Sequence, residues 1–365
     1  MDNNKPLITV ILPTYRRNYD DFLKNAIESV LSQTYENFEF FIVDDGSQDG
    51  SSDLIQGYAE IDPRINYIRF DKNIGLPAYV ILQAYLNSKG EYIAFIFDDC
   101  RWRPDHLECS MSHLLSDKNI LCTYSKCEMH SKHSVSILGK PFDQADLERG
   151  LNFIPNVSVV LHKKVIEDIG WYDPHVILKR SCDLDLWIRI NQKYDFYFID
   201  QVTTDEYGVM LDDSLGNSVG IDLELLKDYM QEDRNHRLLP LNIKLEDSYQ
   251  FNGKNDDENK RFNTLLLDHF MKSVDIEKLL NFNITYDSIE HKIATVKNQH
   301  LSSDHIHLLM LFKQLLDEEK KKTNQAIQNH SIALMVADHR WAHIEKLENQ
   351  RLFKLINKLS FKRKQ

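Results

Sequence analysis

The feature that most constrains the fold is a regular alternation of strand and helix patterns over the first hundred residues. Apolar runs typical of buried strands cover residues 7–15, 38–43, 65–70 and 92–97. Segments with apolar side chains at helical spacing lie between them, at residues 21–34, 51–61 and 75–90. Strands and helices that alternate in this way are joined by right-handed crossovers into a mainly parallel sheet with both faces covered. The sequence therefore predicts an α/β fold.

Each of the four predicted strands has a polar cluster at its carboxyl end or in the loop that follows. The clusters are residues 14–17, 44–47, 72–75 and 98–100. Ligands of such sheets bind outside the carboxyl ends of the strands, so we expect the four clusters to meet in one crevice. The sequence has neither a G-x-G-x-x-G motif nor a G-x-x-x-x-G-K-[ST] motif to cradle a phosphate. Acidic side chains with bound Mg²⁺ or Mn²⁺ remain as the way to hold a diphosphate.

The pair Asp98–Asp99 closes the fourth strand in the stretch YIAFIFDDCRWRPD. Adjacent carboxylates repel each other unless a positive charge lies beside them. The two acids could cap the turn or helix that follows. Their place at the carboxyl end of a buried strand favours a ligand site, and we interpret them as a site for a divalent cation that carries a nucleoside diphosphate.

Composition narrows the class of protein. The net charge of −12 argues against broad nucleic-acid binding, which needs clustered Lys and Arg. No run approaches the roughly 18 apolar residues of a membrane-spanning helix, and the N-terminal residues lack the features of a secretory signal, so we expect a cytoplasmic protein. Five cysteines without a C-x-x-C pair indicate reduced thiols. Cys122, Cys127, His130 and His133 are residue types that zinc accepts, but their spacing is irregular and does not favour a zinc site.

Five motifs in order resemble the inverting nucleotide-sugar glycosyltransferases of family 2, which have the Rossmann-like GT-A fold. They are VILPTYRR, AIESVLSQTYENFEFFIVDDGSQDGS, NIGLPAYVILQAY, GEYIAFIFDD and GWYDPHVILKRSCDLDLWIRI. The last resembles the acidic catalytic motif of the family, usually written E-D-x-D-L-W. The resemblance covers about residues 5–210.

The resemblance implies a nucleotide and metal site. The residues expected to bind the nucleotide are Pro13, Thr14, Tyr15, Asp45, Asn73 and Asp98. Asp45 would accept a hydrogen bond from the base, typically uracil. Asp98 would lie near the ribose or the metal, and Asp99 would be the direct ligand of Mn²⁺ or Mg²⁺.

The resemblance also implies a catalytic base and an acceptor side. Asp183 matches the second acid of the family motif, which takes the proton from the acceptor hydroxyl, and Asp185 and Trp187 would shape the acceptor side. Two positions depart from the family pattern: Cys100 replaces a third acid that many members carry, and Cys182 replaces the Glu of the acidic pair.

Several of these residues also have a purely structural interpretation. Asp45 could be a turn residue within DDGSQDG, and Asp183 could be a surface acid favoured by the dipole of a helix start. Tyr15 and Trp187 could be aromatic residues of the core.

We expect residues 1–220 to form the GT-A domain and residues 221–365 a mostly helical region. Residues 208–220, rich in Gly, Ser, Asn and Asp, are predicted to be a lid over the site. The expected function is transfer of a sugar, most simply from a UDP-sugar, to a hydroxyl of a glycan or lipid-linked acceptor in polysaccharide or cell-surface glycan synthesis. A nucleotidyltransferase is disfavoured by the missing Gly-rich basic loop. A non-catalytic glycan- or nucleotide-binding scaffold stays open because of Cys100.

The C-terminal end has a pattern of its own. Residues 351–365 contain six basic residues and no acid, with Leu352, Leu355, Ile356 and Leu359 on one helical face. Such a helix suits the surface of an anionic membrane, which would place the protein peripherally at the inner membrane surface. The apolar spacing over residues 340–365 equally suits self-association through a short coiled coil.

Overall fold

The computed structural model describes residues 5–212, 214–231 and 243–273. The chain divides into two compact units, Met1–Leu266 and Leu267–Gln365, and the first contains every predicted site residue. Its strands are β1 (Ile8–Thr14), β2 (Phe38–Asp44), β3 (Ile65–Arg69), β4 (Tyr92–Phe95), β5 (Cys100–Trp102), β6 (Cys122–His130), β7 (Val135–Leu138), β8 (Val160–His162) and β9 (Tyr197–Glu206).

The helices of the described residues alternate with these strands in the first half of the chain. They are α1 (Phe22–Leu31), α2 (Ser51–Ile61), α3 (Pro77–Asn87), α4 (His106–Ser116), α5 (Gln144–Glu148), α6 (Lys163–Ile169), α7 (Cys182–Asn191), α8 (Leu215–Ser218), α9 (Leu223–Gln231) and α11 (Asp256–Ser273). Short 3-10 helices include η2 (Val176–Leu178) and η3 (Gly208–Met210). Pro77 begins α3, where its missing N–H costs no helical hydrogen bond.

The described strands form one sheet in the order β3-β2-β1-β4-β8-β6-β9-β5, with β7 paired to β6. Strands β3, β2, β1 and β4 are parallel, which confirms the predicted α/β architecture. The second half is mixed: β8 is antiparallel to β4 and β6, β9 is parallel to β6, and β5 is antiparallel to β9. The carboxyl ends of β1, β2 and β4 therefore lie at one edge of the sheet.

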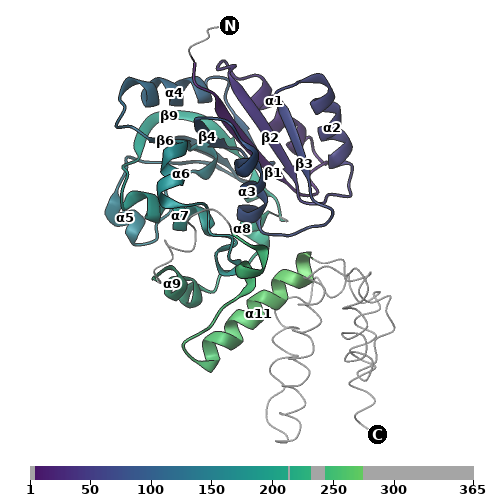
Figure 1. The fold of residues 1–365 in the computed structure, drawn as a ribbon, viewed down its shortest axis with the longest axis vertical. Coiled ribbons are helices and arrows are strands. Elements are labelled where there is room, and N and C mark those ends of the chain that lie inside the picture. The colour runs from purple at the N-terminus through teal and green to yellow at the C-terminus, as the bar shows by residue number, and fades with distance from the viewer. Residues whose placement is uncertain (1–4, 213, 232–242, 274–365) are drawn as a thin grey trace, which may run out of the picture. The chain divides into compact units, whose positions relative to one another are not determined.

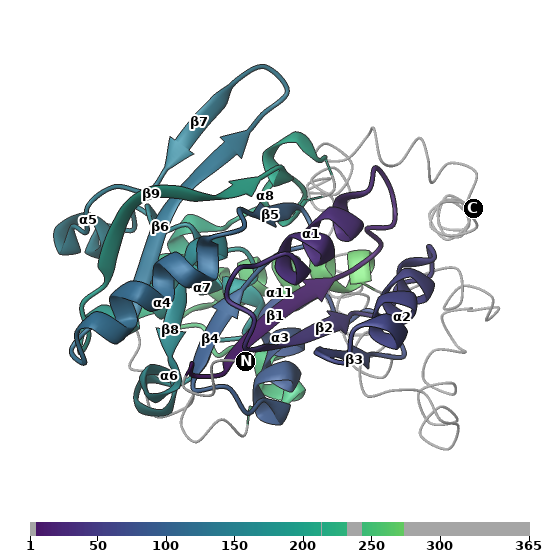
Figure 2. The same ribbon diagram turned by 90° about the horizontal axis from the view of Figure 1, so that it is seen from above.

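Helices cover both faces of this sheet (Figures 1 and 2). Apolar side chains of α1, α2 and α4 join those of the strands in one buried cluster. On the opposite face Phe95 packs against Trp171 and Tyr172, with ring centroids 6.0 and 5.3 Å apart. The Trp187 ring of α7 packs in turn on Tyr172 at 6.0 Å. This aromatic layer fixes α7, the helix that carries Asp183.

The first unit extends beyond the expected domain boundary at residue 220. His175, just before η2, stacks on Tyr229 of α9 at 4.4 Å and on Phe262 of α11 at 5.7 Å. The Tyr229 hydroxyl donates a hydrogen bond to the buried Asp173 carboxylate at 3.1 Å. The beginning of the predicted helical region is thus part of the first unit, because its aromatic side chains pack on the segment that precedes α7.

The remaining predictions about the C-terminal region concern residues that the structure does not describe. The basic segment within residues 340–365 lies outside the described residues. Within the part of the chain that is described, no helix is both long enough and apolar enough to cross a membrane. All five cysteines are free, in agreement with the prediction of reduced thiols.

Candidate active site

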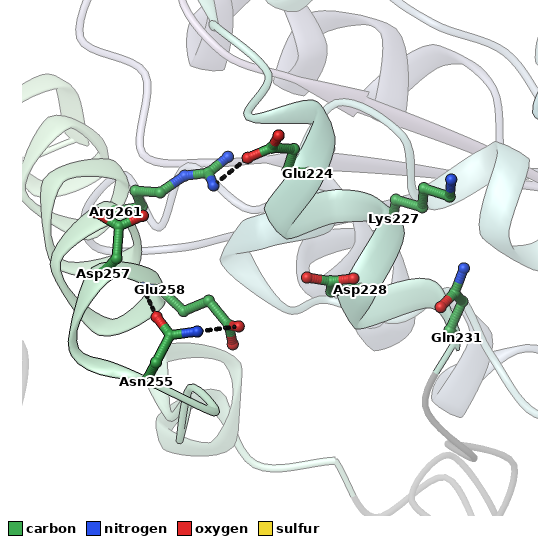
Figure 3. Close-up of a pocket in the computed structure, with 8 residues that line it drawn as sticks. All are labelled: Glu224, Lys227, Asp228, Gln231, Asn255, Asp257, Glu258 and Arg261. Atoms are coloured by element: carbon green, nitrogen blue, oxygen red, sulfur yellow. Dashed lines mark hydrogen bonds and ion pairs between the residues drawn. The ribbon is translucent and has the colours of Figure 1, made fainter.

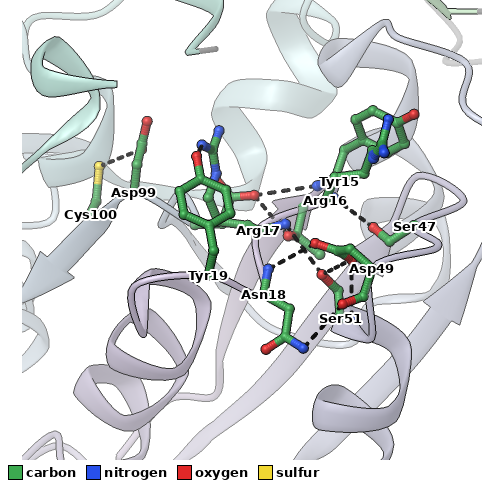
Figure 4. Close-up of polar contacts among 12 residues, drawn as sticks. Tyr15, Arg16, Arg17, Asn18, Tyr19, Ser47, Asp49, Ser51, Asp99 and Cys100 are labelled. Atoms are coloured by element: carbon green, nitrogen blue, oxygen red, sulfur yellow. Dashed lines mark hydrogen bonds and ion pairs between the residues drawn. The ribbon is translucent and has the colours of Figure 1, made fainter. Parts of the chain in front are cut away.

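The four predicted polar clusters meet at the carboxyl ends of β1, β2 and β4. The Asp45 backbone N–H donates to the Thr14 carbonyl at 2.9 Å, and the Thr14 hydroxyl donates to Asp98 Oδ2 at 2.7 Å. In the loop after β1, the Arg16 backbone N–H donates to Ser47 Oγ at 2.8 Å. Figure 4 shows how the loop after β1 lies against the loop after β2. These hydrogen bonds hold the loops after β1 and β2 and the residues after β4 together.

Asp45 anchors the polar cluster at residues 72–75. Its Oδ1 accepts the Ile74 backbone N–H at 2.7 Å, and its Oδ2 accepts the Gly75 backbone N–H at 2.8 Å. Burial raises the pKa of Asp45 to about 6, although these two N–H groups and the Lys179 charge oppose the rise. Next to it, the buried Asn73 Oδ1 has no hydrogen-bond partner among the described residues. This corner of the crevice is therefore rich in hydrogen-bond acceptors.

Asp98 is a buried carboxylate held on both oxygens. Arg17 Nε donates to Oδ1 at 3.2 Å, and the Tyr15 backbone N–H donates to Oδ2 at 3.3 Å, beside the Thr14 hydroxyl. Burial raises the pKa of Asp98 to about 6, Arg17 opposes this, and the neighbouring Asp99 adds to it. Asp98 is thus oriented by protein groups.

Asp99 has a different environment. Its side chain is partly exposed, and the Cys100 thiol donates to its Oδ1 at 3.3 Å, as Figure 4 shows to one side of the Arg17 network. Burial raises the pKa of Cys100 well above its usual value, so this residue is a neutral thiol. Carboxylate oxygens are the donors that Mg²⁺ and Mn²⁺ prefer, and Asp99 presents such oxygens at the crevice. The residues present fit a hard divalent cation.

A second group of metal-type ligands lies at the ends of β6 and β9. One ligand atom each from Glu128, His130 and Asp205 lies within 4.8 Å of the others. Arg103 Nη2 lies 3.1 Å from Glu128 Oε2 and 3.3 Å from Asp205 Oδ1. Because Arg103 already pairs with both carboxylates, we interpret this group as an ion-pair network. His130 belongs to it, whereas Cys122 and Cys127 are buried elsewhere along β6.

Asp183 lies in the first turn of α7. Asn152 Nδ2 donates to its Oδ2 at 2.7 Å. Burial raises the pKa of Asp183, while the Leu184 backbone N–H and Asn152 oppose the rise. A carboxylate with increased proton affinity at the edge of a crevice is suited to accept a proton.

Asp185 and Trp187, predicted on the acceptor side, lie in the interior. Asp185 Oδ2 accepts a hydrogen bond from Arg189 Nε at 2.9 Å, and Arg189 Nη2 donates to the Trp171 carbonyl at 2.8 Å. Trp187 is fully buried. These two side chains fix the orientation of α7, which favours the core interpretation of Trp187.

Glu206, the last residue of β9, was not among the predicted site residues. Burial raises the pKa of Glu206 to about 7, and the charges of Asp99 and then Asp183 raise it further. It therefore lies near both acids. The strand-end rule that identified Asp98 could also have identified Glu206, since Asp98 follows β4 and Glu206 ends β9, each at a carboxyl end.

The predicted lid begins beside Asp99. The Tyr207 backbone N–H donates to the Asp99 carbonyl at 2.9 Å, and η3 follows directly. Asn217 Nδ2 donates to the Leu211 carbonyl at 2.8 Å, which folds this segment back on itself. The role of this segment as a lid stays a prediction.

A separate groove lies between α9 and the start of α11 (Figure 3). It has a volume of about 530 Å³, and its lining includes the acids Glu224, Asp228, Asp257 and Glu258. Arg261 lies in the same groove and forms an ion pair with Glu224. None of the predicted site residues lines it.

Comparison with known proteins identifies the class. The sequence model of the family described as Glycosyl transferase family 2 matches residues 9–170, which include β1 to β8 and the Asp98–Asp99 pair. The S. aureus TarS 1–349 fragment, solved in complex with UDP-GlcNAc, superimposes with a TM-score of 0.52 at 12% identity, over 86% of this chain and 92% of that one. Residues 9–170 thus match the family 2 glycosyltransferases, and the fold is of the GT-A type.

Two curated relatives resemble the N-terminal part of the chain. "Putative teichuronic acid biosynthesis glycosyltransferase TuaG" of Bacillus subtilis is 37% identical over 115 residues, which is 32% of this chain and 44% of that protein. "Putative colanic acid biosynthesis glycosyl transferase WcaA" of Escherichia coli is 43% identical over 112 residues, which is 30% of this chain and 38% of that protein. The chain thus spans less than half the length of either relative.

Proposed function

We propose that this protein transfers a sugar, with inversion of the anomeric carbon, from a UDP-sugar to a hydroxyl of a glycan or lipid-linked acceptor. The observation that carries the proposal is the meeting of the polar clusters at the carboxyl ends of β1, β2 and β4, where Thr14 and Arg17 hold Asp98 and the Ile74 and Gly75 backbone N–H groups hold Asp45. Burial, and then the charges of Asp99 and Asp183, raise the pKa of Glu206, which supports placing the acid suited to a cation and the acid suited to a proton in one crevice. The printed names of the two relatives, which concern teichuronic and colanic acid biosynthesis, support a cell-surface polysaccharide as the product.

The donor side uses the crevice between β1, β2 and β4. Asp45 and Asn73 offer acceptor oxygens to the N–H groups of the base, and Thr14 and Tyr15 line the base and ribose pocket next to Pro13. Asp99 and Asp98 provide the carboxylate oxygens for Mn²⁺ or Mg²⁺. A divalent cation bound there supplies positive charge opposite the departing diphosphate.

The acceptor side is served by Asp183. The acceptor oxygen attacks the anomeric carbon from the face opposite the diphosphate, and its proton passes to the Asp183 carboxylate while the bond from the anomeric carbon to the diphosphate oxygen breaks. A single displacement with the base and the leaving group on opposite faces inverts the configuration, as in inverting glycosidases. Asp185 and Trp187 contribute by holding α7 in place.

Donor binding can be tested by thermal unfolding of the purified protein. A ligand that binds only the folded state raises the unfolding midpoint by mass action. We expect UDP, rather than GDP, dTDP or CMP, to raise the midpoint in Mn²⁺ and to lose this effect in EDTA. If none of the four nucleotides shifts the midpoint under either condition, the donor site assigned here is wrong.

The role of Asp183 can be tested with Asp183→Asn. Loss of the base should lower turnover by about 10²- to 10⁴-fold while the nucleotide-induced shift of the midpoint survives. Asp195→Asn, an exposed acid between α7 and β9, is the matched control and should keep its turnover. A non-catalytic scaffold would bind the nucleotide and show no turnover in the wild type or in either variant.

A further inference from the structure

Glu206 has no function in the reaction as proposed above, yet its position in the sheet is specific. In the antiparallel pair of β5 and β9, Glu206 is the register partner of Cys100. Cys100 is a buried, neutral thiol that donates to Asp99 Oδ1 at 3.3 Å. Cys100, which follows the Asp98–Asp99 pair, therefore contributes no charge. Glu206, its partner on β9, contributes a carboxylate.

Gly208 limits the distance between the carboxylates of Asp99 and Glu206. A β-carbon at Gly208 would lie 2.5 Å from Asp99 Oδ2 and 3.7 Å from Glu206 Oε1. The two oxygens are therefore no more than the sum of these distances, 6.2 Å, apart. Two oxygens bound to one Mg²⁺ or Mn²⁺ lie about 3–4 Å apart, given metal–oxygen distances of about 2.1 Å. Rotation of the long Glu206 side chain can close this difference.

The neighbourhood of Glu206 is strongly acidic. Asp99 and Asp183 are the charges that act on it. In the part of the chain that the structure describes, its side chain forms no ion pair with Lys, Arg or His. Like charges in a partly buried crevice are unfavourable unless a cation lies between them.

We propose that Glu206 is a ligand of the divalent cation together with Asp99. This inference rests on the function proposed above, since it concerns the same cation. Glu206 is the last residue of β9, and Asp99 lies in the turn between β4 and β5, so the cation would connect this turn to the end of β9 at the crevice. The backbone bond from the Tyr207 N–H to the Asp99 carbonyl keeps the two residues adjacent without the cation.

The test is a titration of the full chain with Mn²⁺ alone, in which electron paramagnetic resonance measures the free ion. Glu206→Gln should weaken Mn²⁺ binding by at least the ~10-fold that loss of an outer-shell partner costs. Asp99→Asn shows how far Mn²⁺ binding falls when the expected direct ligand is lost. Asp205→Asn is the matched control, because Asp205 precedes Glu206 on the same strand and pairs with Arg103 on the other face. It should bind Mn²⁺ like the wild type.

Thermal unfolding in EDTA separates a ligand from a structural residue. If Glu206 is a ligand, Glu206→Gln should unfold at the same temperature as the wild type or higher, because it removes one of three like charges. A clearly lower midpoint in EDTA would make Glu206 a structural residue and overturn the inference.

The outcomes also distinguish this inference from the proposed function. Normal Mn²⁺ binding by Glu206→Gln with weakened binding by Asp99→Asn would overturn the role of Glu206 and leave the proposed function in place. Weakened binding by Asp205→Asn, with Glu206→Gln unaffected, would move the cation to the group formed by Glu128, His130 and Asp205. Unchanged Mn²⁺ binding by Asp99→Asn, with no nucleotide-induced shift in the wild type, would remove the proposed function itself.

Discussion

At the scale of single residues, the adjacent acids Asp44 and Asp45 have different roles. Asp44 is fully buried and accepts hydrogen bonds from the Ser47 backbone N–H at 2.8 Å, from Ser52 Oγ at 2.7 Å and from the Tyr67 hydroxyl at 3.0 Å. Successive side chains at a strand end point to opposite sides, so Asp45 faces the loop after β3 instead. Asp44 builds the turn, and Asp45 is the acid placed at the crevice.

Gly46 follows this pair and carries the first prediction at this scale. Its φ is +77°, and an added β-carbon would lie 2.6 Å from the Lys72 carbonyl carbon. Gly46→Ala should lower the free energy of unfolding by at least about 2 kcal/mol, from backbone strain and steric overlap. Gly57 in α2 has open space around it. Gly57→Ala should instead raise the free energy of unfolding by about 0.5–1 kcal/mol.

Urea unfolding of both glycine variants checks this prediction. A Gly46→Ala protein as stable as the wild type would show that the loops after β2 and β3 are not held as close together as described. The nucleotide-induced shift of the midpoint should also shrink in Gly46→Ala, because Asp45 and Asn73 lie on those two loops. It should be unchanged in Gly57→Ala.

At the scale of elements, the sequence predicts one half of the sheet better than the other. Strands β1 to β4 follow from alternation with helices, and their carboxyl ends carry Thr14, Asp45 and Asp98 as expected. The order β4-β8-β6-β9-β5 depends on pairings between segments far apart in the chain, and β5 has only three residues. Local periodicity contains no information about these pairings, so it could not place Glu206 beside Asp99.

Helix α7 shows a second limit of the sequence pattern. The stretch CDLDLWIRIN predicts a helix with acids near its start, and this is what the structure has. The pattern could not tell which acid faces the crevice. Asp185 turns inward because Arg189, one turn later, pairs with it, whereas Asp183 is bonded by Asn152 from a distant loop.

The docking of α9 gives the prediction at the scale of elements. Tyr229 donates to the buried Asp173 carboxylate, which also accepts the His175 backbone N–H at 2.9 Å. Tyr229→Phe keeps the stacking on His175 but removes the hydroxyl donor. It should lower the free energy of unfolding by about 1–3 kcal/mol, the usual cost of removing a partner from a buried polar group.

Tyr197→Phe is the matched control, since Tyr197 is 40% exposed at the start of β9. It should change the free energy of unfolding by less than about 0.5 kcal/mol. Chemical denaturation of the two variants gives the comparison. Equal stability of Tyr229→Phe and the wild type would mean that α9 does not hold the segment before α7 through this hydroxyl.

At the scale of the whole molecule, the compact unit is larger than the family match. The match ends at residue 170, and the unit ends at Leu266. Helical periodicity after residue 220 predicted helices, but it could not predict that Tyr229 and Phe262 pack on His175. Those contacts are between residues far apart in the sequence, and they make α9 part of the body that carries Asp183.

The pH dependence of the free energy of unfolding is a property of this whole unit. The raised pKa of Glu206 should contribute to it. The pKa of Glu206 is about 7 in the folded state, against 4.5 for an ordinary glutamate. A raised folded-state pKa contributes stability that is fully present below the unfolded value and lost as the pH rises through the folded value. His106, whose pKa is lowered to about 3 by burial, opposes this trend below about pH 6.5. A comparison with Glu206→Gln cancels the His106 contribution, which both proteins share.

We therefore expect the wild type and Glu206→Gln to be equally stable near pH 4.5 in EDTA. Between about pH 4.5 and pH 7 the wild type should become less stable relative to the variant. The difference should reach on the order of 2 kcal/mol, at about 1.4 kcal/mol per unit of pKa separation and after allowance for solvent screening. Glu36→Gln, at an exposed acid before β2, should show no such drift. Urea unfolding at several pH values measures it, and a difference independent of pH would mean that Glu206 is already ionised in the metal-free protein.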